Sequence, residues 1–462
     1  MSKQDHIKNI AEWVVGLKTD HVSRDVIHIA KRILLDTIGV VCAGKKHQIT
    51  GRLLQALSQK LDGRAACTVV GGSKANSQDA SLINGTAAHV WDYDDVSYAG
   101  ILHGSAVILP AVLAIAEEKG ASDEKILLSL IAASEVTYLL GEVSGYGHYE
   151  AGWWSTGTLA TIGATVGTAK LLGLNEQQTA NAISLAVCRA GIPRAVVGTS
   201  AKPLLCGHSA KVGIELAFFA SLDIQGPANI LERKNGFFDL FKPDQPRLEI
   251  LSTLGVKWRL QEPGILTKRY PVCSAALAGA EQICQLKHKH KLKHKHKLKY
   301  KDINFVYVEV SELVALSLGS FDDPQTAREC QFSIPFITAC GLYYGDLKLE
   351  HLTLETLKKN EIRTLMAKVS WSVNPEFSKK EFSTNAPECY SICVTMSDGY
   401  ELSGFLGIAS EMTDSQIVDK FFSCVKFSNA NFEHAEKAVQ ILSEKRNIKQ
   451  NHSILNTVQN LF

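Results

Sequence analysis

Long apolar runs, a strong net charge and paired cysteines are all missing from this sequence of 462 residues. No uninterrupted apolar run approaches about 20 residues, the length of a membrane-crossing helix, so we expect no membrane span. The first residues, M-S-K-Q-D-H-I-K, contain no apolar signal segment. A formal net charge of +2 gives no reason to expect nucleic acid or another strongly charged partner.

The eleven cysteines are scattered along the chain, and no C-x-x-C pair occurs among them. Cys42, Cys188 and Cys340 lie in apolar helical runs and are expected to be small buried thiols. This usage suits a reducing compartment, so we expect a cytoplasmic protein. The sequence also shows no metal-ligand spacing, and we expect no metal.

The periodicity of the apolar residues changes twice along the chain. Up to about residue 266 they recur at helical spacing. Alternation typical of strands follows at 303–310, 364–373 and 390–402, the last with a turn at Asp398-Gly399. Helical spacing returns at 413–426 and 432–444. The sequence therefore predicts a mainly α protein with a smaller α+β domain, and its length allows two domains.

Acidic residues crowd beside a predicted core helix in the stretch from His89 to Pro110. Asp92, Asp94 and Asp95 follow His89, and His103 comes just before a long alanine-rich apolar run. Burying an unpaired carboxylate is expensive, so such a group usually has a partner or a task. The alternative is a helix N-terminus preceded by acidic caps. The second histidine favours a functional site.

Two further stretches indicate binding. Residues 144–173 begin as a glycine-rich loop and continue as a helix of small residues, which we expect to be central. Ser155 or Thr156 is placed to cap it, and its N-terminus would then favour an anion; the alternative is that its glycines serve helix crossing alone. Lys202 lies between small residues and an apolar run, which favours a pocket over the solvated position usual for lysine.

Taken together, these segments resemble the MmgE/PrpD family, which contains 2-methylcitrate dehydratases and cis-aconitate decarboxylases. The similarity begins with H-x-x-D-Y-D-D followed by H-G-S-A-V-I-L-P-A. Other segments agree in the same order: G-T-x-x-x-x-G-A at 157–164, K-L-L-G-L at 170–174, A-K-P-L at 201–204, G-x-x-x-A at 213–217, G-P-x-x-I-L-E at 226–232, N-G-F-F at 235–238 and K-R-Y-P-V-C-S-A at 268–275. No single motif would suffice, but the ordered combination is specific.

The resemblance implies a large all-helical domain with a smaller α+β lid inserted into it. We expect helices over 1–266, the lid over 267–403, and helices of the first domain again over 404–462. It also implies a catalytic cleft between the domains, a homodimer and no cofactor. The residues carried over as catalytic are His103, Asp92, Asp95, Lys202 and Lys268. Those expected to bind substrate are Asp94, Ser97, His148, Trp154 and Phe336.

The chemistry of these residue types agrees with a small carboxylic acid as substrate. Lysines supply the cations that carboxylates need. Histidine has a pKa near ambient pH and can move the proton in the loss of water or CO2 next to a carboxylate. A carboxylate beside it can hold one tautomer or stabilise the imidazolium.

Several family positions differ in this chain. Trp154 stands where the family has a histidine, Leu205 where it has another, and Phe336 where it has a tyrosine. One extra residue before His103 leaves Val96 and Ser97 as alternatives for the family's threonine. Polar groups have thus become apolar, which points away from a standard tricarboxylate dehydratase. His148, just upstream of Trp154, is a candidate to replace the missing histidine.

The tract 287–301 contains the unit K-H-K-H-K-L twice and carries eight lysines. Removing those charges from the net +2 leaves −6 for the rest of the chain. We interpret the tract as a flexible basic insert before a lid strand, because like charges repel and prevent a core. Metal capture by its histidines and contact with an acidic surface are the alternatives.

Two classes of function remain open on the sequence. The first is a lyase acting on a small di- or tricarboxylic acid, as a dehydratase or decarboxylase, with isomerisation or epimerisation as a neighbouring outcome. The second is a binding protein that retains the fold without the activity. Asp92, His103, Lys202 and Lys268 favour the first, and the apolar replacements favour the second or a changed substrate.

Overall fold

The computed structural model describes residues 5–241, 246–294, 300–379, 387–443 and 453–462. The chain divides into two compact units. The helical unit comprises Met1–Val196, Ser200–Thr267 and Thr413–Phe462. The sheet unit comprises Val197–Thr199 and Lys268–Met412. The expected boundary at residue 403 was wrong, because strand β6 (Glu401–Leu406) continues past it and pairs with β5 (Tyr390–Met396).

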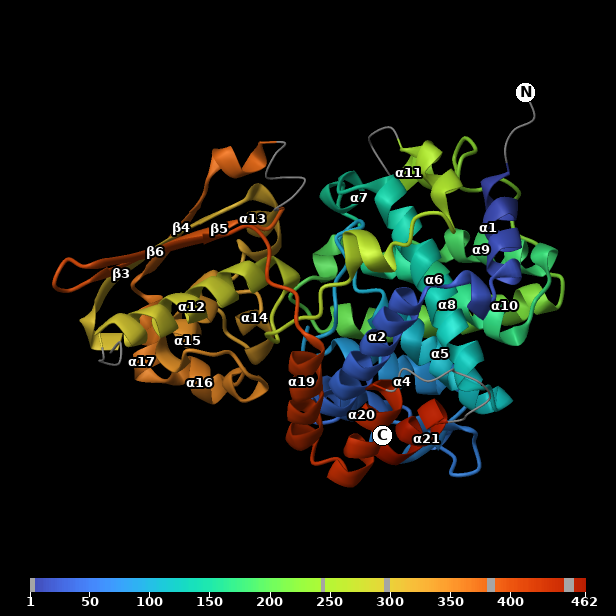
Figure 1. Cartoon of the computed structure of the whole chain (residues 1–462), viewed down its shortest axis with the longest axis horizontal. Coiled ribbons are helices and arrows are strands. Elements are labelled where there is room, and N and C mark those ends of the chain that lie inside the picture. Colours follow the sequence, from blue (N-terminus) through green and yellow to red (C-terminus); the bar gives the residue numbers. More distant parts are fainter. Residues whose placement is uncertain (1–4, 242–245, 295–299, 380–386, 444–452) are drawn as a thin grey trace. The chain divides into compact units, whose positions relative to one another are not determined.

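The helical unit is built mainly of α-helices (Figure 1), with short helical turns and one small hairpin between them. Its helices are α1 (His6–Gly16), α2 (Arg24–Gly44), α3 (Gln48–Ala56), α4 (Ser77–His89), α5 (Ser105–Lys119), α6 (Asp123–Ser144), α7 (Gly147–Glu150), α8 (Ser155–Leu172), α9 (Glu176–Arg189), α10 (Ala201–Ser221), α11 (Phe237–Phe241), α19 (Asp414–Ser428), α20 (Phe432–Ser443) and α21 (Ser453–Leu461). The hairpin pairs β1 (Cys67–Val69) with β2 (Ser73–Ala75) in antiparallel fashion.

Capping side chains explain where several of these helices begin. Ser23 accepts a hydrogen bond from the backbone of Val26 at the start of α2. At the start of α19, Thr413 and Gln416 form a reciprocal capping box. Such caps satisfy backbone N–H groups that have no partner within the helix. They fix the first turns of two helices that pack closely together and carry residues of the site described below.

Helix α8 lies at the centre of the helical unit, as its small residues predicted. Nearly all of its side chains are buried, and it packs against α5, α6, α9 and α10. A second close packing joins α4 to α10. There a Cβ on Gly207 would lie 2.0 Å from the carbonyl oxygen of Leu82. Glycine at this position therefore lets α10 approach the helix that leads into the acidic stretch.

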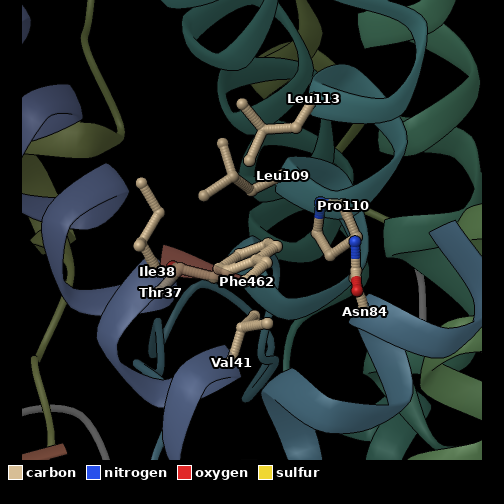
Figure 2. A pocket seen from close by; sticks show the side chains of 8 residues that line it. All are labelled: Thr37, Ile38, Val41, Asn84, Leu109, Pro110, Leu113 and Phe462. Carbon is tan, nitrogen blue, oxygen red and sulfur yellow. The ribbon is translucent and has the colours of Figure 1, made fainter. Parts of the chain in front are cut away.

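Two features of the helical unit reflect its apolar core. Helix α6 is long and apolar enough to cross a membrane by composition, but almost all of its most apolar stretch is buried within the unit. The ring of Phe462 lines a cavity of about 10 Å³ beside Leu109 and Ile38 (Figure 2). A void of that size holds about one water molecule, so it belongs to core packing. Cys188, expected to be buried, is exposed on α9.

The sheet unit contains a four-stranded sheet in the order β4-β3-β5-β6. Strand β3 (Ile303–Val310) has the predicted bounds, runs parallel to β4 (Val369–Val373) and antiparallel to β5. Its helices are α12 (Leu277–His294), α13 (Glu312–Leu318), α14 (Ala327–Cys330), α15 (Ile334–Tyr344), α16 (Leu354–Lys358) and α17 (Asn360–Met366). Helices α12 and α15 pack against the sheet (Figure 1).

Two sequence predictions in the sheet unit need correction. Residues 364–366 are helical, because Ile362, Leu365 and Met366 form the buried side of α17 before the strand begins. The start of the basic tract is also helical, since α12 continues to His294. Lysine and leucine are good helix formers, so a helix already anchored in the core extends into them. Residues 295–299 of the tract lie outside the described residues.

Candidate active site

The acidic stretch forms a buried loop that connects α4 to α5 in the helical unit. Asp92, Asp94 and Asp95 are each at most 1% exposed. Asp92 has a φ of +49°, in the left-handed region that is uncommon for residues other than glycine. Just before it, the Trp91 indole donates to the carbonyl of Ala43 at 3.0 Å. The alternative of acidic caps is not what the structure has, because the N-cap residue of α5 is Gly104 and no side chain among the described residues caps that helix.

Asp92 is paired with a lysine from a distant part of the chain. Lys202, in the first turn of α10, donates from Nζ to Asp92 Oδ2. Both side chains are almost completely buried. Removing one partner of such a pair leaves a desolvated charge, so the contact holds the loop firmly to α10. Lys202 thus lies in the interior and not in solvent, and a pocket around it stays a prediction.

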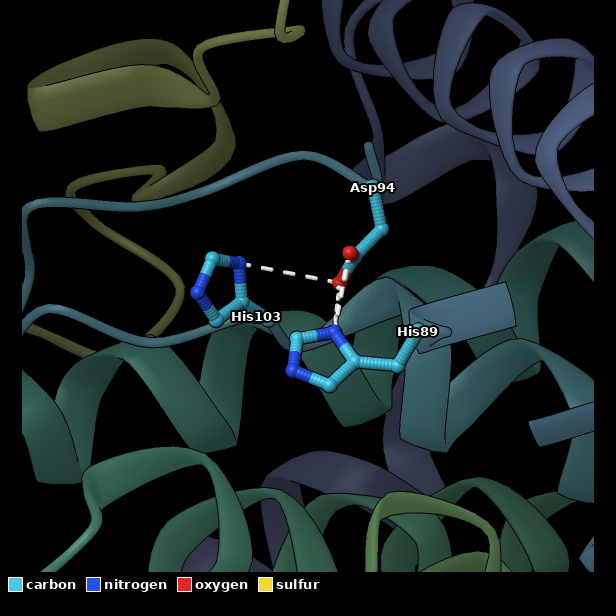
Figure 3. A group of neighbouring side chains, drawn as sticks. All are labelled: His89, Asp94 and His103. Carbon is cyan, nitrogen blue, oxygen red and sulfur yellow. Dashed lines mark hydrogen bonds and ion pairs between the residues drawn. The ribbon is translucent and has the colours of Figure 1, made fainter. Parts of the chain in front are cut away.

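Asp94 is shared by two histidines (Figure 3). Nδ1 of His89, the last residue of α4, lies 2.9 Å and 2.8 Å from the two carboxylate oxygens. Nδ1 of His103 lies 3.6 Å from Asp94 Oδ2. The two imidazole rings have their centroids 4.9 Å apart. We call these three residues the His-Asp-His triad.

His103 has a defined orientation within this triad. Its Nδ1 donates to the backbone carbonyl of Asp95 at 2.8 Å. A carbonyl only accepts, so the proton of the neutral ring is on Nδ1 and Nε2 carries the lone pair. The backbone N–H of His103 donates to Thr156 Oγ1, in the first turn of α8, at 3.0 Å. His103 is therefore held from two sides with a basic nitrogen directed away from both bonds.

The environment of Asp95 disfavours its charged form. Ser105, the first residue of α5, donates its hydroxyl to Asp95 Oδ2, while Oδ1 has no hydrogen-bond partner within the described part of the chain. Burial raises the pKa of Asp95 to about 7, against the lowering effect of the Ser105 hydrogen bond. This carboxyl therefore holds a proton in a substantial fraction of molecules near neutral pH.

A second buried lysine was not predicted from the sequence. Lys420 of α19 lies 2.8 Å from Asp36 Oδ1 and donates to the carbonyl of Tyr93 at 2.7 Å. Its ammonium also lies 4.0 Å from the centroid of the Tyr93 ring. Burial raises the pKa of Asp36, and Lys420 acts against that rise. Lys420, on a C-terminal helix, thus fixes the acidic loop. Neither Asp36 nor Lys420 stands in a sequence motif from which their pairing could be predicted.

Two other residues predicted for the site, Trp154 and Ser97, also lie in the helical unit. Trp154 is 2% exposed, and its ring centroid lies 5.8 Å from that of His89, so it is beside the triad. Ser97 donates its hydroxyl to the carbonyl of Gly264 at 3.1 Å, which is a contact within the fold. Ser155 does not cap α8, whose N-cap residue is Trp154.

His148, the candidate to replace the missing family histidine, is held by hydrogen bonds within the helical unit. Its Nδ1 lies 2.9 Å from the carbonyl of Phe241 and its Nε2 lies 2.7 Å from Thr158 Oγ1. Burial lowers its pKa to about 4, so the ring is neutral at physiological pH. Both nitrogens are engaged in packing contacts, and we therefore remove His148 from the candidate site.

Lys268 and Phe336 belong to the sheet unit. Lys268 is fully buried and donates to the carbonyl of Val272 at 3.1 Å. Phe336 is fully buried in the first turn of α15. Their contribution to a site with the residues of the helical unit stays a prediction of the family resemblance.

The spacing of the triad also allows a metal ion, because its ligand-type atoms lie within 4.8 Å of one another. Hydrogen bonds account for this spacing without one. Both Nδ1 atoms face oxygen acceptors at 2.8 Å, the usual separation of a charge-assisted or neutral hydrogen bond. We therefore describe the triad by its proton chemistry.

Comparison with known proteins shows the family of this chain. The MmgE/PrpD N-terminal domain matches residues 8–249, and the MmgE/PrpD C-terminal domain matches residues 270–445. The chain belongs to the MmgE/PrpD family. This family has a two-domain architecture. The C-terminal match includes residues 413–445, which belong to the helical unit.

Relatives of known activity are distant. Cis-aconitate decarboxylase of Homo sapiens is 25% identical over 399 residues, covering 85% of this chain and 81% of the relative. Cis-aconitate decarboxylase of Aspergillus terreus is 25% identical over 435 residues, covering 89% of this chain and 87% of the relative. The family rests on the two domain matches, and the substrate of this member is a separate question.

Proposed function

We propose that this protein is a lyase that acts on a small di- or tricarboxylic acid. His103 moves a proton at the carbon next to a carboxylate, and water or CO2 leaves the substrate. The family's range of decarboxylases and dehydratases supports this reaction type. The observation that carries the proposal is the orientation of His103, whose Nδ1 donates to the Asp95 carbonyl, so that the neutral ring carries its lone pair on Nε2.

The buried charges around His103 support the same chemistry. Asp94 lies close enough to stabilise the imidazolium that forms when His103 accepts a proton. Lys202 brings a cation into the same region, where a substrate carboxylate would compete with Asp92 for it. In a site shielded from water such charges act more strongly than on a surface. Together, the histidine His103, the lysine Lys202 and the two carboxylates beside them can bind an anion and transfer a proton.

Trp154 supports a substrate that is smaller or less charged than 2-methylcitrate. The indole lies beside His89, where the family has a histidine that could donate to a carboxylate. A third carboxylate against this ring would be desolvated without a partner. Phe336 would act in the same direction if, as the resemblance implies, it belongs to the site.

The test is a substrate screen followed by a substitution. The purified protein is incubated with cis-aconitate, citrate, 2-methylcitrate and smaller hydroxy- and aminodicarboxylates, and products are followed by NMR. For any substrate that turns over, His103→Ala should lower kcat by roughly 10²–10⁴-fold, the usual cost of losing a general acid or base. His148→Ala is the matched control and should not cause such a loss. Full activity of His103→Ala would refute the proposal.

Two alternatives give different results in the same screen. An isomerase or epimerase of a dicarboxylate would exchange the substrate's α-hydrogen for deuterium in D2O and return the other isomer without a leaving group. A binding protein would protect against thermal unfolding with a carboxylate but give neither exchange nor product. The binding-protein alternative is supported by the loss of polar family positions at Trp154, Leu205 and Phe336.

A further inference from the structure

The His-Asp-His triad contains one imidazole that the proposed chemistry does not use. His89 is fully buried, and its Nδ1 contacts both oxygens of Asp94, at 2.9 Å and 2.8 Å. His103 lies farther from the same carboxylate, at 3.6 Å, and makes its shorter contact with the Asp95 carbonyl at 2.8 Å. The two rings therefore compete unequally for Asp94.

The protonation state of His89 follows from its surroundings. Asp94 accepts at Nδ1, so the proton of the neutral ring is on that atom. Its Nε2 is buried and has no hydrogen-bond partner among the residues that the structure describes. A protonated Nε2 in that position would be an unsatisfied buried donor, which is costly. Burial also lowers the pKa of His89. His89 is thus a neutral donor, and Figure 3 shows its Nε2 on the side of the ring away from Asp94.

We infer that His89 is a positioning residue that sets the proton affinity of His103 through their shared carboxylate, Asp94. By donating to both oxygens, His89 satisfies much of the hydrogen-bonding capacity of Asp94. The carboxylate then stabilises a protonated His103 less than an uncommitted one would. His103 stays neutral and able to accept a proton. This inference rests on the proposed function only in taking His103 as the proton carrier.

Other titratable and charged groups surround the triad, and the substitution of His89 alone leaves each of them in the sequence. Asp92 and Lys202 form an ion pair between the loop and α10. Asp95 is bonded to Ser105 of α5, and the buried phenol of Tyr138 on α6 faces Gly104 of the same loop. Cys206 of α10 is also buried there. Burial and the nearby carboxylates of Asp94 and Asp92 raise the pKa of its thiol, and Lys202 acts against that rise. The Asp36–Lys420 pair comes from α2 and α19. A shift on changing His89 therefore reports the triad itself.

The experiment is an NMR titration of the full chain labelled with ¹³C at histidine Cε1. His89→Phe removes the donor but keeps a ring, and should raise the pKa of His103 by about one unit, the size expected for strengthening one nearby charge. His89→Asn keeps an N–H at the position of Nδ1 and should leave the His103 pKa close to that of the unchanged protein. His148, bonded to Thr158 and Phe241, is the internal control whose signal should stay in place.

Asp94→Asn provides a second test that does not depend on the folding of His89→Phe. It removes the shared charge and should lower the pKa of His103 by about one unit. An unchanged His103 pKa in His89→Phe, an equal shift in His89→Asn, or no fall in Asp94→Asn would each overturn the inference. The titration needs no substrate, so it can succeed where the substrate screen fails, and a failed titration leaves the lyase proposal standing.

Discussion

Asp95 makes the stability of the helical unit depend on pH. Its pKa is about 7 in the folded protein and has a usual value of 3.8. A raised pKa means that the folded state binds the proton more tightly than the unfolded state. That stabilisation is complete below the unfolded pKa and is lost as the pH rises through the folded value.

Asp95→Asn should remove this dependence, because the amide is neutral at every pH and keeps an oxygen for the Ser105 hydroxyl. We expect the variant and the unchanged protein to differ little in free energy of unfolding at pH 4. At pH 8 the variant should be relatively more stable by on the order of a few kcal/mol. Urea denaturation at both pH values measures this, and Glu135, whose pKa burial also raises to about 7, cancels in the comparison. An equal difference at both pH values would contradict it.

The Asp92–Lys202 pair gives a second prediction at this scale. Lys202→Met should destabilise the protein by about 3 kcal/mol, since it leaves a buried carboxylate without this cation. Adding Asp92→Asn should recover part of that loss, because asparagine is neutral and tolerates the left-handed backbone at φ +49°. Thermal unfolding of the single and double variants checks this. A double variant that is less stable than Lys202→Met would show that the pair does not act as described.

Secondary structure was predictable from the sequence where a pattern was long or strictly alternating. Strand β3 shows this, since its burial alternates from Val306 to Val310, with an irregularity between Ile303 and Phe305. The stretch T-L-M-A-K-V-S-W-S-V was misjudged because its first residues are apolar at spacings that fit either a helix or a strand. The site divides in the same way. Asp92, His103 and Lys202 stand in recognisable motifs, whereas the Asp36–Lys420 contact joins residues far apart in the chain and exists only through tertiary packing.

Helix packing leads to a prediction about elements. Gly207→Ala would place a methyl group 2.0 Å from the carbonyl oxygen of Leu82. Because that oxygen belongs to the backbone, a side-chain rotation cannot relieve the clash. Helices α4 and α10 would have to separate, which should cost several kcal/mol of stability and loosen the Asp92–Lys202 contact. Gly51→Ala in α3 is the matched control, because nothing lies within 4 Å of its added Cβ. That change should be neutral or stabilising by roughly 0.5–1 kcal/mol. Equal melting temperatures for the two variants would contradict the packing argument.

For the whole molecule, the family resemblance leads us to expect a homodimer that forms through the helical unit. Light scattering at micromolar concentration should give a mass near twice the 50.4 kDa of one chain. A mass of 50.4 kDa that holds across dilution would refute the dimer. All eleven cysteines are free thiols, so the same mass is expected with and without a reducing agent.

The acidic loop also bears on how the protein is made. Its five consecutive residues, Trp91 to Asp95, are held by α2, α10, α19, α4 and α5 in turn. Helix α19 leaves the ribosome only after the entire sheet unit has been synthesised, because Lys268–Met412 precedes it. Contacts between such distant segments form late, since a long stretch of chain must be closed first. A nascent chain halted before α19 would contain His103, Asp92 and Lys202, yet its loop would lack the lysine that fixes Tyr93. Completion of the site therefore coincides with completion of the chain.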